Sequence, residues 1–163
     1  MTTIQMDNAQ FLPHVCQFVQ EGHKVTIGAK GNSMRPFIES GRDAVVLSQL
    51  SKPVVGDVVL AELEPGHYVL HRVDAIKGEH IRLRGDGNPY QTEQCSIEDL
   101  RATVVTVVRK GRNYATSSRT WKAYSWMWIH LLPLRRYLLA LYRLLWRGEL
   151  PARFTRKQVS SKL

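Results

Sequence analysis

The sequence predicts a mostly-β (α+β) fold: a compact antiparallel β domain, preceded by a short N-terminal helix and followed by a C-terminal amphipathic helical tail. Short runs rich in valine and other β-formers succeed one another between residues 24 and 108, separated by glycine and proline turns. Helical periodicity lies at the two ends of the chain. A length of 163 residues with 44% hydrophobic and 23% charged residues suits one folded domain and excludes collagen and wholesale disorder.

The first segment, residues 1–23, contains a predicted amphipathic helix over residues 7–21. Gly22 is expected to end it, because glycine readily adopts the left-handed conformation that follows many helices. The apolar residues assigned to its buried face are Phe11, Val15, Phe18 and Val19.

The central segment, residues 24–110, holds the predicted β domain. Turn residues delimit six runs that are expected to form strands, at 24–30, 44–47, 57–63, 68–73, 80–84 and 102–108. Closely spaced short strands with few helices between them favour antiparallel pairing.

The last segment, residues 111–163, is predicted to be a polar linker over 111–120 followed by a basic amphipathic helix. One helix face carries Leu134, Leu138, Leu141 and Leu145, and the opposite face carries Arg136, Arg143 and Arg147. Residues 1–108 hold 10 basic and 13 acidic side chains, whereas residues 109–163 hold 13 basic and one acidic. This asymmetry predicts an anionic partner for the tail.

Two interpretations of the tail are open. Leucines interleaved with arginines and tryptophans favour an anionic membrane surface bound through residues 121–147, and make nucleic acid the less suitable partner. Alternatively, the apolar face packs on the β domain or on a second copy of the chain. The sequence does not determine the oligomeric state.

Residues 1–20 lack the pattern of a secretory signal, and no run reaches the ~18–20 apolar residues that span a bilayer. The predicted location is therefore cytoplasmic and peripheral on the inner face of the membrane. Cys16 and Cys95 are expected to be reduced. No spacing typical of metal ligands occurs, and neither a metal nor another cofactor is predicted.

Three residues of the β domain supply the chemistry of a serine hydrolase. Ser33 follows a Gly-Asn break at a strand end, where its hydroxyl is expected to be exposed. A serine hydroxyl needs an adjacent base, which His71 can provide. A carboxylate on the other ring nitrogen would orient that base, and Asp86, set between two glycines, is the predicted candidate. Each residue alone would more often be structural.

The order of four short motifs resembles the signal peptidase I family, across about residues 24–108. Residues 31–36 (GNSMRP) resemble the serine motif, residues 56–59 (GDVV) the second, and residues 71–73 (HRV) the position of the general base. Residues 84–89 (RGDGNP) resemble the closing Gly-Asp-Asn motif, with Gly87 added. A histidine base resembles the archaeal and endoplasmic-reticulum branch, whereas bacterial signal peptidases and the related SOS-repressor autopeptidases use lysine.

The resemblance implies a serine endopeptidase that removes a leader or signal-like segment from a peptide or protein precursor. It assigns Ser33 as nucleophile, His71 as general base and Asp86 as third member, with Met34 and Pro36 of the serine motif beside the substrate. The substrate would lie extended along an edge strand. The alternatives are a non-catalytic peptide- or membrane-binding module and a self-cleaving regulator of the SOS-repressor type.

Overall fold

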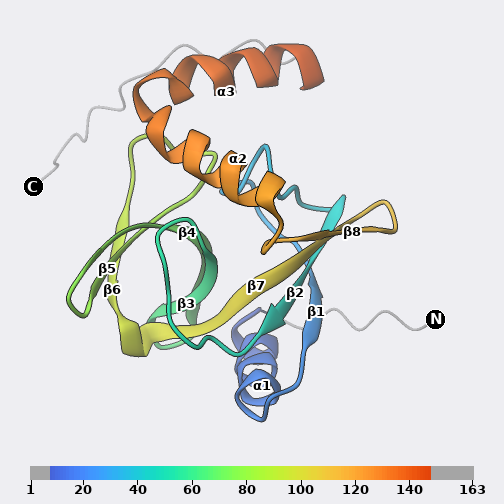
Figure 1. Ribbon diagram of the computed structural model, residues 1–163. Coiled ribbons are helices and arrows are strands. Elements are labelled where there is room, and N and C mark those ends of the chain that lie inside the picture. Colours follow the sequence, from blue (N-terminus) through green and yellow to red (C-terminus); the bar gives the residue numbers. More distant parts are fainter. Residues whose placement is uncertain (1–7, 148–163) are drawn as a thin grey trace, which may run out of the picture.

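A computed structural model of the protein describes residues 8–147 (Figure 1). Within this range the helices are α1 (Asn8–Gln20), α2 (Arg119–His130), α3 (Leu132–Arg147) and the short 3-10 helix η1 (Ile97–Asp99). The strands are β1 (Val25–Gly28), β2 (Asp43–Ser48), β3 (Val58–Glu64), β4 (His67–Lys77), β5 (His80–Arg84), β6 (Glu93–Ser96), β7 (Leu100–Arg109) and β8 (Arg112–Ala115). The outer parts of the predicted N-terminal and C-terminal segments lie outside the described residues.

All the strands belong to one antiparallel sheet, which confirms the predicted mostly-β fold. The strand order is β1-β2-β7-β3-β4-β5-β6, and β8 also pairs with β7. The long strand β7 connects the two halves, since residues 103–109 pair with β2 and residues 100–103 pair with β3. Strands β1 and β6 form the two ends of the order, and β1 leads directly into the loop that carries Ser33.

The six predicted strands are all present, but the sequence prediction missed two. Strand β6 has no run of β-formers and pairs in register with β5, with Cys95 opposite Ile81. The predicted linker over 111–120 is wrong for residues 112–115, which form β8. Lys110 (φ 49°) and Gly111 (φ 76°) are both left-handed and make the tight turn from β7 to β8.

The helix predicted over residues 7–21 is confirmed as α1, but its buried face is not the predicted one. Val15 and Val19 are buried as expected, whereas Phe11 and Phe18 are 38% and 54% exposed. The buried face also contains Leu12 and Cys16, so its spacing follows the helical repeat of three and four residues. The sequence prediction favoured the larger aromatic residues over this register.

Helices α2 and α3 cover the side of the molecule away from α1 (Figure 1). Ser118 caps α2, its hydroxyl accepting a hydrogen bond from the Trp121 amide at 3.2 Å. Trp128 of α2 and Leu139 of α3 belong to the same buried cluster as residues of α1, β2 and β7. The tail is therefore integrated with the β domain, at least along one face of each helix.

The leucine face predicted for the tail helix points outward. Leu134, Leu138, Leu141 and Leu145 are between 37% and 67% exposed. The contact side of α3 instead carries Leu139 and Arg135, which are 5% and 1% exposed. Among residues 8–147, no helix is long and apolar enough to cross a membrane.

Both cysteines are free and buried. Burial raises the pKa of Cys16 and of Cys95 to about 11, which keeps each as a neutral thiol inside the core. Neither is suited to act as a thiolate nucleophile.

Candidate active site

Ser33 lies in the loop between β1 and β2, on an exposed turn two residues after the left-handed Gly31 (φ 82°). Amides of Phe37 and Ile38 donate hydrogen bonds to the Met34 carbonyl at 3.1 and 3.0 Å, so the residues after Ser33 form a compact turn. The serine carbonyl is also fixed, because it accepts a hydrogen bond from the Gly87 amide at 2.7 Å. These hydrogen bonds fix the backbone at Ser33 and at the turn that follows it, and so fix the position from which the hydroxyl projects.

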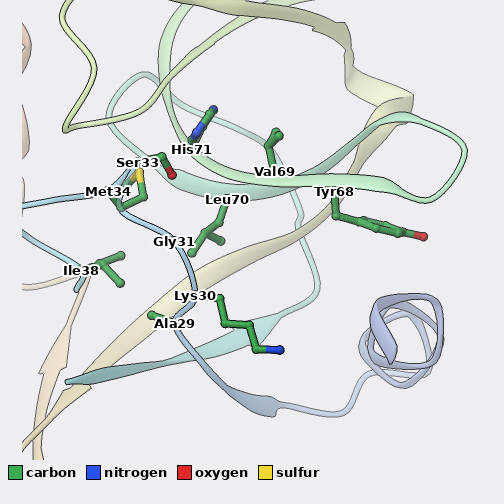
Figure 2. Close-up of a pocket in the computed structure, with 10 residues that line it drawn as sticks. All are labelled: Ala29, Lys30, Gly31, Ser33, Met34, Ile38, Tyr68, Val69, Leu70 and His71. Atoms are coloured by element: carbon green, nitrogen blue, oxygen red, sulfur yellow. The ribbon is translucent and has the colours of Figure 1, made fainter. Parts of the chain in front are cut away.

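His71 comes from the middle of β4, where it pairs with Val59 of β3. The residue is 8% exposed, but its ring helps to line the pocket that Ser33 opens into. Figure 2 shows the two side chains near one another at one end of this pocket, with Lys30 and Tyr68 farther along it. The sheet therefore holds the candidate base rigidly.

Gly85 lies against both side chains. A Cβ on Gly85 would stand 3.2 Å from His71 Nε2, 3.2 Å from Ser33 Cβ and 2.6 Å from the Ser33 carbonyl oxygen. The imidazole nitrogen and the serine Cβ consequently lie no farther apart than twice 3.2 Å. Both residues also line the same pocket, so the imidazole and the serine side chain are neighbours there.

The other ring nitrogen of His71 binds a carboxylate that the sequence prediction missed. His71 Nδ1 lies 2.8 Å from Oε2 of Glu93, the first residue of β6. The Glu93 side chain is 28% exposed, and that of His71 is 10% exposed. Sequence patterns do not indicate this pair, because 22 positions separate its members and β6 itself was not predicted.

Asp86 does not contact His71. Its two carboxylate oxygens accept hydrogen bonds from Arg72 Nε at 2.8 Å and Nη2 at 2.6 Å. This pair is buried, with side-chain exposures of 1% and 2%. The expected placement of Asp86 on the histidine ring is therefore wrong, although its neighbours Gly85 and Gly87 do contact the serine loop.

The additional glycine of the closing motif has a steric reason. A Cβ on Gly87 would stand 2.8 Å from the Asn32 carbonyl oxygen and 3.3 Å from that of Ser33. No side chain fits between the closing motif and the serine loop at this contact.

The pocket beside Ser33 has a volume of about 150 Å³ and a mixed polar and apolar lining. Met34 lines it together with Ala29, Ile38, Val69 and Leu70, and its contact with a substrate stays a prediction. Pro36 does not line it; this residue follows a cis peptide bond and lies half-buried in the turn. A cavity of this size holds a small side chain.

The Peptidase S24-like family model matches residues 3–108. The chain belongs to this family. The match spans α1 and the strands from β1 through most of β7, and so includes Ser33, His71 and Glu93. It places the chain in the peptidase clan shared by signal peptidases and SOS-repressor autopeptidases. A search of curated proteins finds no match.

Members of the Peptidase S24-like family generally hydrolyse peptide bonds, and some are non-catalytic. In this chain His71 Nε2 and Ser33 Cβ both lie 3.2 Å from the position that a Cβ on Gly85 would occupy, and His71 Nδ1 binds Glu93. Such an arrangement can transfer the serine proton to the imidazole during attack on a carbonyl carbon.

Proposed function

We propose that the protein is a serine endopeptidase in which Ser33 is the nucleophile and His71 the general base. The observation that carries this proposal is the convergence of His71 Nε2 and Ser33 on the same side of Gly85, beside an open pocket. The family match supports peptide-bond hydrolysis as the reaction class. The histidine base is the feature shared with the Ser/His branch of signal peptidases.

The reaction follows from the positions of the two side chains. Ser33 Oγ attacks the scissile carbonyl carbon while its proton passes to His71 Nε2, and the imidazolium then protonates the leaving amine. The acyl-serine is hydrolysed when water gives its proton to His71 and its oxygen to the acyl carbon. The proton returns to Ser33 as the carboxylic product leaves.

The substrate that best fits the site is an extended peptide segment with a small side chain next to the cleaved bond. The edge strand β1 can pair with such a segment, and the small pocket lies where β1 runs into the serine loop. A leader or signal-like segment of a precursor has this chemistry.

The test compares wild type with Ser33→Ala and His71→Ala. Each protein is treated with a fluorophosphonate probe and incubated with a defined peptide library that is analysed by mass spectrometry. Ser51→Ala and His67→Ala are matched controls, because both residues are exposed and His67 lies on the same strand as His71. We expect cleavage by wild type and both controls and a loss of at least about 10³-fold in Ser33→Ala.

Cleavage retained by Ser33→Ala, or its absence from folded wild type with and without vesicles, overturns the proposal in favour of a binding module. The intact mass of wild type, followed over days, separates the remaining possibility. Loss of full-length chain in wild type but not in Ser33→Ala assigns the activity to self-cleavage, whereas a constant mass supports a separate substrate.

We further propose that α3 holds the protein on an anionic membrane surface. The outward leucine face offers a continuous apolar strip, and residues 109–163 carry 13 basic side chains against one acidic. Exposed apolar residues combined with a strong positive charge suit a surface of anionic lipid. The α3 leucine face is not the face that packs on the β domain.

Vesicle sedimentation tests this placement, with phosphatidylcholine vesicles that either contain or lack phosphatidylglycerol. The double variant Leu141→Glu/Leu145→Glu should lose binding to the anionic vesicles. Phe18→Glu is the matched control, since Phe18 is 54% exposed on α1 at the other end of the molecule. A lipid-free dimer that the double variant dissociates would assign the leucine face to a second copy instead.

A further inference from the structure

We propose that Glu93 is the positioning residue of the active site, holding the His71 ring so that Nε2 accepts the Ser33 proton. The inference rests on the proposed roles of Ser33 and His71 and adds a third member that the sequence motifs do not contain. It is carried by the 2.8 Å contact between His71 Nδ1 and Glu93 Oε2.

The contact fixes which ring nitrogen is free to react. A carboxylate oxygen accepts hydrogen bonds, so the neutral imidazole that binds it carries its proton on Nδ1. The lone pair then lies on Nε2, the nitrogen that faces Gly85 and Ser33. When Nε2 takes the serine proton, the Glu93 carboxylate stabilises the resulting imidazolium.

The strand order explains how Glu93 reaches a histidine two strands away. Leu83 of β5 pairs with Val73 of β4 on one side and with Glu93 of β6 on the other. Strand β5 ends at Arg84, one residue later, and is followed by Gly85, which has no side chain. Glu93 can therefore extend diagonally past the end of β5 to His71.

The other charged groups near this region are engaged elsewhere. Asp86 binds Arg72 through both carboxylate oxygens. Arg72 follows His71 on β4, so the Arg72 side chain projects from the side of the sheet opposite to His71. Lys30 lines a more distant part of the pocket (Figure 2). Within residues 8–147, the carboxylate bonded to the His71 ring is that of Glu93.

The first experiment reads the ring directly, without any substrate. Proton–nitrogen NMR spectra of ¹⁵N-histidine-labelled protein distinguish imidazole protonated on Nδ1 from imidazole protonated on Nε2. We expect the Nδ1-protonated form in wild type and a mixture containing the Nε2-protonated form in Glu93→Ala. Glu98→Gln is the matched control, because Glu98 is an exposed acid close to the end of β6.

The second experiment measures kcat and KM with the library peptide that wild type cleaves best. Glu93→Ala and Glu93→Gln should lower kcat by about 10²–10³-fold and leave KM within about twofold, since Glu93 does not touch the peptide. Glu93→Asp keeps the carboxylate on a shorter side chain and should recover part of the lost kcat. Folding is checked by the thermal unfolding midpoint of each variant.

An unchanged His71 tautomer in Glu93→Ala, or full kcat in that variant while Ser33→Ala is inactive, overturns the role of Glu93 and leaves the Ser33–His71 proposal standing. Cleavage by Ser33→Ala at the wild-type rate overturns the proposed function. In that case the NMR result still decides whether Glu93 orients the His71 ring. If kcat/KM of the Glu93 variants falls only in proportion to their thermal unfolding midpoints, that result also counts against a positioning role.

Discussion

His71 and Arg72 are consecutive residues of β4, project to opposite sides of the sheet, and each binds one carboxylate. His71 contacts Glu93 through a single ring nitrogen at 2.8 Å, and more than a quarter of the Glu93 side chain is exposed. Arg72 binds both oxygens of Asp86, and both members are almost fully buried. The two pairs thus differ in depth and in the number of hydrogen bonds.

The buried pair also anchors α2. Arg72 Nη1 donates to the Gly56 carbonyl at 2.8 Å and to Ser125 Oγ at 2.6 Å, while Trp128 Nε1 donates to the Asp86 carbonyl at 3.3 Å. A guanidinium stays charged at any physiological pH, whereas an imidazole can exchange its proton. We therefore expect Asp86 to support the scaffold, and we propose the His71–Glu93 pair for proton transfer.

The largest expected effect on stability comes from Asp86→Asn. This change leaves the Arg72 guanidinium buried without its counter-charge, which typically costs about 3–5 kcal/mol. Glu93→Gln, at the half-open pair, should cost less than about 1 kcal/mol. Urea unfolding of both variants checks the contrast. Wild-type stability combined with lost cleavage in Asp86→Asn would instead make Asp86 part of the catalytic machinery.

The two pairs also show how far sequence patterns reach into this site. Ser33 and His71 were predictable because each lies in a short motif whose residues are close in the chain. The partners of His71 and Arg72 depend on β5–β6 pairing and on which face of β4 each residue occupies. Asp86 lies in a glycine-flanked motif that suits a catalytic carboxylate. Side chains alternate along β4, however, and Asp86 lies on the side of the sheet from which Arg72 projects.

A second effect should appear at Gly85, between the serine loop and His71. Gly85→Ala would place a methyl group 3.2 Å from both His71 Nε2 and Ser33 Cβ and 2.6 Å from the Ser33 carbonyl oxygen. Because small displacements of reacting groups are costly, we expect kcat to fall by about 10²-fold. Gly78→Ala, at the left-handed turn between β4 and β5, serves as control and should lose stability without losing kcat. Equal kcat in both variants would contradict the close approach at Gly85.

The third effect concerns Asp43, another carboxylate held by arginines. Burial alone would raise the pKa of Asp43, but hydrogen bonds from Arg42 and Arg109 and from the Glu39 amide outweigh it and lower the pKa to about 2. Since the folded-state pKa lies below the unfolded value of 3.8, the contribution is fully present above about pH 5 and is lost as the pH falls toward 2. Its size is about 2 kcal/mol.

Chemical denaturation between pH 6 and pH 2 measures this contribution. The free energy of unfolding of wild type should fall across the range, and that of Asp43→Asn should fall by about 2 kcal/mol less. Parallel plots of unfolding free energy against pH for the two proteins would show that the pKa of Asp43 is the same in the folded and unfolded states. The side-chain partners of Asp43 are arginines, which stay charged between pH 6 and pH 2. Protonation of Asp43 should therefore lower the stability of the fold.

The apolar patterns teach a similar lesson about α1 and α3. The periodicity located both helices, but not which neighbour each apolar face meets. In α1 the core selects the register of Leu12, Val15, Cys16 and Val19. In α3 the leucines point outward, and the contact is made by Leu139 and by Arg135, whose guanidinium lies 5.0 Å from the Trp128 ring. Packing against residues distant in the chain determines which face of each helix is buried. Local sequence periodicity does not contain that information.

The smallest expected effect is that of Ser125→Ala, which removes the contact between α2 and the buried pair. One N–H of Arg72 Nη1 keeps the Gly56 carbonyl and the other loses its acceptor. Because the guanidinium keeps its three other hydrogen bonds, the cost should be about 1 kcal/mol, at the low end for a buried donor that loses its acceptor. Urea unfolding measures this cost, and the cleavage assay should show kcat within about twofold of wild type. If kcat falls tenfold while stability is retained, α2 acts on the serine loop through Asp86 and Gly87, and the two sides of β4 are functionally coupled.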